Sequence, residues 1–145
     1  MEILQADLAS LLERIEQTPV LREHHVWEAA RCVSIDLRDR RSTTTRRFAE
    51  LIAAGAVLDA VMALIAVTEP QRVVSGIRNV EGRWLCTLQV APTRTQRAVR
   101  TYRAEHQDLP AALLMSLLLS FRQGRRGFPR RAAAPATMQQ ERPAP

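Results

Sequence analysis

The stretch QRVVSGIRNVEGRWLCTLQV, residues 71–90, alternates apolar and polar side chains on both sides of a short turn. Residues 71–77 and 83–90 predict two strands, because side chains two positions apart lie on one face of a strand. In the second strand that apolar face consists of Trp84, Cys86, Leu88 and Val90. Residues 79–82 predict the turn, since Gly82 can adopt a positive φ. The segment therefore predicts a β-hairpin.

A long apolar segment precedes the hairpin. Residues 46–67 predict one helix, which Thr44 or Thr45 can cap. From residue 51 onward this segment is apolar except for Asp59, a pattern typical of a buried helix or a membrane span. It is shorter than the ~20 residues that a span needs and has an acid near its middle, which favours burial in a protein core. Asp59 is then either a buried acid with a functional partner, or a side chain that lies on an exposed edge or pairs with an arginine of the linker.

The residues after the hairpin allow two readings. Residues 94–104 form either a third strand or a helix that aligns four arginines into one stripe. We expect the strand, because a two-stranded hairpin alone is marginally stable. A closing helix over residues 109–122 follows, with Asp108 as its expected cap and Pro110 in its first turn. Its wide apolar face comprises Leu113, Leu114, Leu117, Leu118 and Phe121.

The start of the chain predicts two further helices, over residues 3–17 and about 21–36. The expected organisation is an N-terminal helical region (1–37), a linker (38–45), an α+β domain (46–122) and a disordered Arg/Pro/Ala-rich tail (123–145). The expected fold class is α+β, with a small antiparallel sheet of two to four strands packed by helices 46–67 and 109–122.

All 21 basic residues are arginine, which is typical of a GC-rich genome. Residues 1–120 are nearly neutral, and the tail contributes +5 of the +6 net charge. Two cysteines are few for a disulfide scaffold, and residues 1–17 do not resemble a secretory signal. We therefore expect a cytoplasmic protein that is not embedded in a membrane.

Candidate chemistry is sparse. His24, His25 and His106 could suggest a metal site, but adjacent histidines on a helix point about 100° apart and a surface pair is the simpler reading. Cys86 could be a nucleophile, but the apolar face of the hairpin favours a buried, inert thiol. Phosphate-loop, hydrolase and metalloprotease motifs are missing from the sequence. We therefore predict no catalytic residue, metal or cofactor, and no enzyme activity.

Three segments resemble a known family. They are LIAAGAVLDAVMALI (51–65), RWLCTLQV (83–90) and LPAALLMSLLLSF (109–121). Together they resemble the small phage ABA-sandwich domain proteins found in prophages of GC-rich bacteria, over about residues 50–122. Leu109-Pro110 stands where that family usually has threonine-proline. The resemblance implies an α+β fold and a phage-like context, and it implies no catalytic residues.

Two functions follow as expectations. The first is a non-enzymatic, phage-derived or bacterial accessory role through protein–protein interaction or self-association, with an interaction face at Leu4, Leu8, Leu11 and Ile15. The alternative is nucleic-acid binding, because arginines interleaved with an aromatic side chain can contact phosphates and stack on bases. Its expected contacts are Arg97, Arg100, Tyr102 and Arg103, with Arg125, Arg126, Arg130 and Arg131 of the tail.

Overall fold

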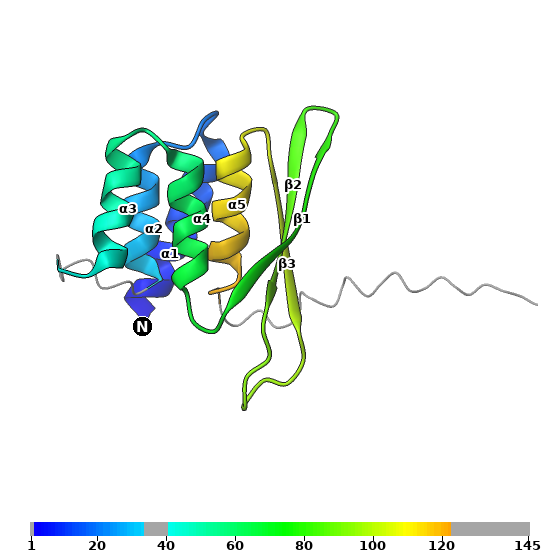
Figure 1. Ribbon diagram of the computed structural model, residues 1–145. Coiled ribbons are helices and arrows are strands. Elements are labelled where there is room, and N and C mark those ends of the chain that lie inside the picture. The colour runs from blue at the N-terminus through cyan, green and yellow to red at the C-terminus, as the bar shows by residue number, and fades with distance from the viewer. Residues whose placement is uncertain (1, 34–40, 123–145) are drawn as a thin grey trace, which may run out of the picture.

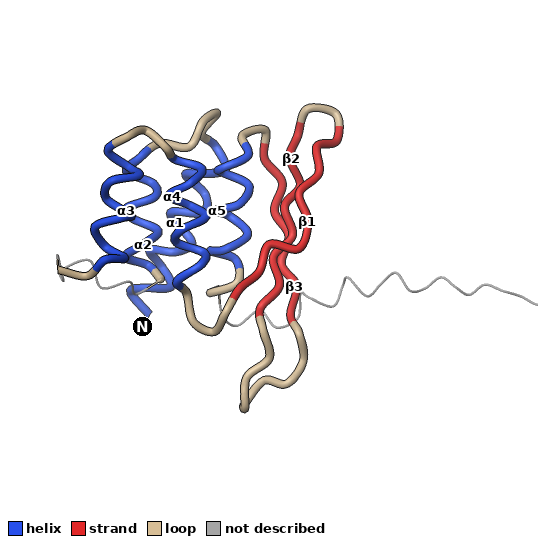
Figure 2. Tube along the Cα trace, in the orientation of Figure 1, coloured by secondary structure: helices blue, strands red, loops and turns tan. Residues whose placement is uncertain are grey.

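The computed structural model describes residues 2–33 and 41–122, with the backbone alone for residues 2–4. The helices are α1 (Glu2–Gln17), α2 (Glu23–Cys32), α3 (Thr43–Ala53), α4 (Val57–Val67) and α5 (Leu109–Leu119). The strands are β1 (Arg72–Val80), β2 (Arg83–Val90) and β3 (Arg100–His106), paired antiparallel in the order β1-β2-β3. Figures 1 and 2 show the five helices on one side of the sheet. The α+β prediction is confirmed.

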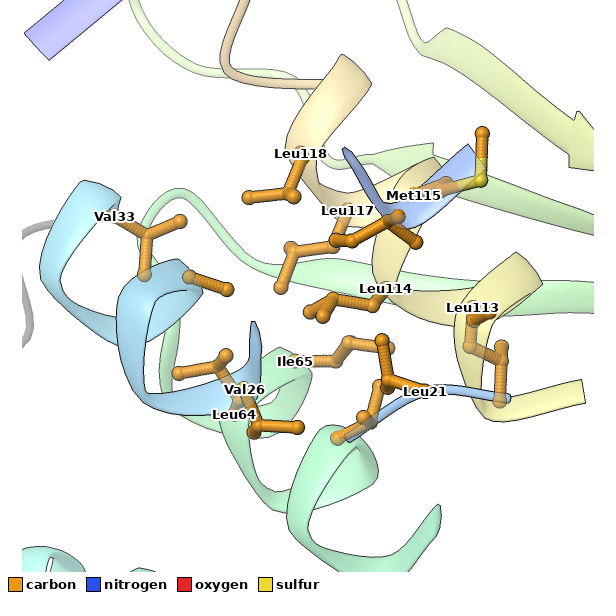
Figure 3. Close-up of a cluster of buried hydrophobic side chains, with 14 of the residues drawn as sticks. Leu21, Val26, Val33, Leu64, Ile65, Leu113, Leu114, Met115, Leu117 and Leu118 are labelled. Carbon is orange, nitrogen blue, oxygen red and sulfur yellow. The ribbon is translucent and has the colours of Figure 1, made fainter. Parts of the chain in front are cut away.

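Helix α5 lies between the sheet and the other helices (Figure 1). Every residue from Ala111 to Leu118 is buried, so α5 has no solvent-facing side. Such a helix needs apolar partners all round, and the sheet supplies one set while α1, α2 and α4 supply the other. Figure 3 shows leucines of α5 beside Val26 of α2 and Leu64 and Ile65 of α4. The predicted single apolar face of this helix is therefore too narrow.

The hairpin prediction is confirmed, with a longer first strand, a second strand at the predicted bounds and a tighter turn. Glu81 and Gly82 form a two-residue loop in which both φ angles are positive, at 52° and 84°. This is the type I′ geometry, whose twist matches that of the flanking strands. The predicted third strand is also present, although β3 begins only at Arg100.

The predicted single helix over residues 46–67 is wrong, because the chain reverses at Gly55 and makes two helices. Gly55 has φ +75°, the Ala56 N–H donates to the Leu51 carbonyl, and the Gly55 N–H donates to the Ile52 carbonyl. These bonds form the Schellman motif that ends helices at a left-handed glycine. The start also differs from the prediction, since the Ser42 side chain accepts from the Thr45 N–H and α3 begins at Thr43.

The two N-terminal helices belong to the same hydrophobic core as the rest of the described chain. The turn between β3 and α5 holds them in place. The Leu21 N–H donates to the Asp108 carboxylate at 3.0 Å, and His106 Nε2 lies 3.0 Å from the Ile15 carbonyl. Asp108 occupies the N-cap position, but its side chain does not cap α5. That prediction is wrong because the carboxylate bonds the backbone N–H before α2 instead.

Several predicted boundaries fall partly outside the described residues. Residues 34–40, at the expected end of the N-terminal helical region and start of the linker, and the expected disordered tail (123–145) are not described. Within the described residues, no helix is both long and apolar enough to cross a bilayer.

Glycine conformation offers a test of the reversal between α3 and α4. Gly55→Ala should lower the free energy of unfolding by about 1 kcal/mol, because a Cβ is strained at positive φ although space around it is open. Urea titration measures the loss. Gly76→Ala is the matched control, since its Cβ would meet Thr87 at an ordinary 3.8 Å. Equal losses in both variants would contradict the explanation.

Candidate functional site

No described helix covers the face of the sheet that points away from α5 (Figure 1). The strand register identifies its members, because directly paired residues point to the same side. We call this the outer face: Val73, Gly76, Arg78, Val80, Arg83, Leu85, Thr87, Gln89, Thr101, Arg103 and Glu105. The inner face, which contacts α5, includes Cys86, Leu88 and Ala104.

Charge is segregated between the two layers. Residues 71–107, which form the sheet and its loops, contain seven arginines and only two acids, Glu81 and Glu105. The described residues outside that segment contain seven arginines and ten acids. A genome-wide preference for arginine over lysine explains the residue type but not this placement. The near-neutral folded part therefore has a basic sheet and an acidic helical layer.

Five of the seven sheet-layer arginines are exposed. Arg78, Arg83 and Arg103 lie on the outer face, and Arg94 and Arg97 lie in the loop between β2 and β3. The Arg83 guanidinium is 3.8 Å from the Glu105 carboxylate, and both side chains are about half exposed. Such a surface ion pair contributes little, so it leaves Arg83 able to bind another anion.

The exposed arginines are spread along the length of the sheet. The β1–β2 hairpin, with Arg78 and Arg83, projects at one end, and the β2–β3 loop projects at the other (Figures 1 and 2). At the usual rise per residue, β2 separates Arg83 from Val90 by about 23 Å. The loop tip is closed by the Thr93 N–H donating to the Gln96 carbonyl and the Gln96 N–H donating to Thr93 Oγ1. Arg94 therefore lies at a defined turn.

The structure divides the predicted nucleic-acid contacts into three groups. Arg97 and Arg103 are exposed on the basic layer. Arg100 and Tyr102 are on the inner face and half-buried, with the Arg100 guanidinium 3.4 Å from the Tyr102 hydroxyl. The tail arginines 125, 126, 130 and 131 lie outside the described residues. Arg78 and Arg83 were missed, although the period of two places Arg83 opposite the Trp84 face.

The predicted interaction face of α1 occupies a different environment from the one expected. Leu8, Leu11 and Ile15 are at most 2% exposed and pack in the core, while the Leu4 side chain is not described. Helix α1 packs against α5 and α2, so a partner could reach these side chains only by separating the helices.

Histidines and acids do not converge on one point within residues 2–33 and 41–122, where no cluster of three metal-ligating side chains occurs. His25 Nδ1 accepts from the Arg22 N–H at 3.1 Å, and His106 Nδ1 accepts from the Asp108 N–H at 2.9 Å. Each of these two histidines therefore accepts a hydrogen bond from a backbone N–H group. Asp59 is exposed on α4, which leaves it without the buried environment that would mark a functional acid.

A hollow of about 170 Å³ lies between α3 and α4, with a mainly apolar lining that includes Phe48, Leu64 and Val67. Thr44, Thr45 and Arg47 stand at α3 along the same hollow. None of these lining residues is an acid, a histidine or a cysteine. The hollow therefore lacks the acid–base groups that catalysis requires.

The predicted inert thiol at Cys86 is testable by alkylation. Cys86 is 0% exposed, and burial raises the pKa of its thiol to about 11. Cys32 is half-buried, and burial raises its pKa as well. With iodoacetamide at pH 8, Cys32 should react slowly and Cys86 only after unfolding in urea, as peptide mass spectrometry would show. Rapid modification of Cys86 in the folded protein would contradict the assignment.

The same thiol makes stability depend on pH. An unfolded thiol ionises near its ordinary pKa of 9.0, whereas folded Cys86 stays protonated to about pH 11. The stability contributed by keeping this thiol protonated is therefore fully present below pH 9. It is lost between pH 9 and 11, where the free energy of unfolding falls by up to about 2–3 kcal/mol. Urea titrations at pH 8 and 10.5 should show a smaller decline for Cys86→Ala than for the wild type. An equal decline in the variant and the wild type would show that a group other than Cys86 causes the loss of stability.

Comparison of the sequence with protein-family models and curated proteins, and of the structure with solved structures, gave no match. The resemblance to phage ABA-sandwich domain proteins therefore stays a prediction from the sequence.

Proposed function

We propose that this chain is a non-enzymatic binding protein that holds double-stranded nucleic acid on the outer face of its sheet. The observation that supports this most is the segregation of charge, with five exposed arginines against two acids in the sheet layer. Arginine is suited to phosphate because its planar guanidinium offers two parallel N–H donors. Phosphate contacts supply most of the affinity of sequence-independent binding to nucleic acid.

The side chains of the outer face favour a duplex over a single strand. Single-strand binding relies on aromatic side chains that stack on bases, and the outer face has none, since Trp84 and Tyr102 belong to the inner face. Thr87, Gln89 and Thr101 add hydrogen-bonding groups between the arginines. A face about 23 Å long along β2 alone covers about seven base pairs at 3.4 Å each.

Protein–protein interaction, the function first expected from the sequence, is the second candidate. Three apolar side chains of the edge strand β1 are substantially exposed: Val73 at 49%, Ile77 at 43% and Val80 at 44%. An edge strand also leaves backbone N–H and C=O groups unpaired, and another strand can bond to them. This proposal also includes a phage-derived setting and a cytoplasmic location. Both rest only on the sequence resemblance and the composition.

Fluorescence anisotropy with a labelled duplex of about 20 base pairs tests the first proposal. The full chain should bind with a salt slope of about −0.9 per phosphate contact. Arg78→Gln, Arg83→Gln and Arg103→Gln combined should reduce that slope by about 2–3 and weaken binding steeply at low salt. A single strand of the same sequence should bind more weakly than the duplex.

The matched control replaces three exposed arginines of the helical layer, Arg31, Arg46 and Arg47, with glutamine. This variant loses the same charge but should keep most of its duplex affinity and its salt slope. Equal losses in the two triple variants would show that net charge, and not the outer face, drives binding. No binding by the full chain at low salt would remove the proposal and leave the protein-interaction candidate.

A further inference from the structure

A second group of arginines lies on the opposite face of the sheet. Arg72 and Arg100 are both paired with Val90, one from each side, so their side chains emerge on the inner face beside the C-terminal end of α5. Arg72 is 6% exposed, while Arg100 and Tyr102 are half-buried and remain within reach of solvent. Two guanidinium groups therefore share one partly enclosed end of the sheet.

The guanidinium group of Arg72 forms hydrogen bonds at the C-terminal end of α5. Its Nε donates to Ser120 Oγ at 2.8 Å, and its two Nη atoms donate to the Pro70 and Ser120 carbonyls. Its guanidinium lies 4.0 Å from the centre of the Phe121 ring. These contacts cap the C-terminus of α5, whose dipole supplies about half a negative charge. Two of the five guanidinium N–H groups are left over.

Arg100 has weaker partners. One Nη lies 3.4 Å from the Tyr102 hydroxyl, and the Nε atom is buried without a hydrogen-bond partner. Burial and, to a smaller extent, the nearby positive charge of Arg100 together lower the pKa of Arg72 to about 10. Neither arginine forms an ion pair with an acid in residues 2–33 and 41–122.

The charges at this end of the sheet do not balance. Two guanidinium groups contribute +2, and the end of α5 offsets about 0.5 of that. Buried charges are normally paired, and buried donors are normally hydrogen-bonded, because water no longer solvates them. A bound anion would satisfy both the excess charge and the unpaired Arg100 Nε.

We propose that Arg72, Arg100 and Tyr102 form a binding site for a phosphate-type oxyanion beside the C-terminus of α5. The tetrahedral oxyanion would accept from the free N–H groups of both arginines and from the Tyr102 hydroxyl. Either free phosphate or the terminal phosphate of a nucleotide offers this chemistry. The site is on the inner face, so it is separate from the duplex surface and does not depend on it.

Isothermal titration calorimetry of the full chain, at constant ionic strength set with chloride, tests the site. Inorganic phosphate and a nucleoside 5′-monophosphate are the two probes. Arg100→Gln should weaken binding of the phosphate group by about tenfold or more, since a charged hydrogen bond is lost. Tyr102→Phe should weaken it less. Arg100 is only half-buried, so its replacement should leave the fold intact, which circular dichroism checks.

Arg103→Gln is the matched control, because it removes an arginine from the outer face, three residues away. It should leave phosphate affinity unchanged while weakening duplex binding, and Arg100→Gln should do the reverse. Tighter binding of the monophosphate than of free phosphate would identify a nucleotide as the source, and equal binding would identify the free ion. No heat from either probe at millimolar concentration, or equal losses in Arg100→Gln and Arg103→Gln, would overturn the site.

Discussion

Helix α5 is buried on every side, and this burial determines where the other elements can lie. Eight consecutive residues, from Ala111 to Leu118, are buried, so apolar surface must meet each side of the helix. Each fully buried leucine contributes about 1.5–3 kcal/mol relative to exposure. Ser116 inside this helix and Ser120 at its C-cap remain compatible with the core, because their hydroxyls donate back to carbonyls one turn earlier. A sheet on one side and helices on the other follow directly.

The layers around α5 are joined by polar contacts at its two ends. At the N-terminal end, His106 and Asp108 bond the chain on either side of the α1–α2 connection, which fixes the N-terminal helices against the sheet layer. At the C-terminal end, Arg72 ties the first strand to the last turn of α5. Each contact links residues at least 48 positions apart in sequence. These contacts turn an apolar packing arrangement into one with a defined orientation.

Sequence patterns predicted the elements better than the contacts between them. The hairpin, the third strand and the helical segments follow from local periodicity, whereas the reversal at Gly55 requires knowing that one glycine adopts φ +75°. Asp108 has every local feature of a helix cap, yet a distant backbone N–H at Leu21 competes for its carboxylate. The α1 leucines have the pattern of an interaction face because a monomer core and an interface select the same side chains. Only the tertiary structure distinguishes these outcomes.

The distribution of charge is the feature that is hardest to predict from the sequence. The net charge of the folded part is nearly neutral, although the sheet layer is basic and the helical layer is acidic. Within β3, the alternation of side chains sends Arg103 to the outer face and Arg100 to the inner face, three residues apart. Arg103 remains hydrated, so its charge acts at long range and is screened by salt. Arg100 is partly desolvated beside Arg72, so an anion there would interact at short range and with defined geometry. One strand can thus present the same residue type to two different kinds of anion contact.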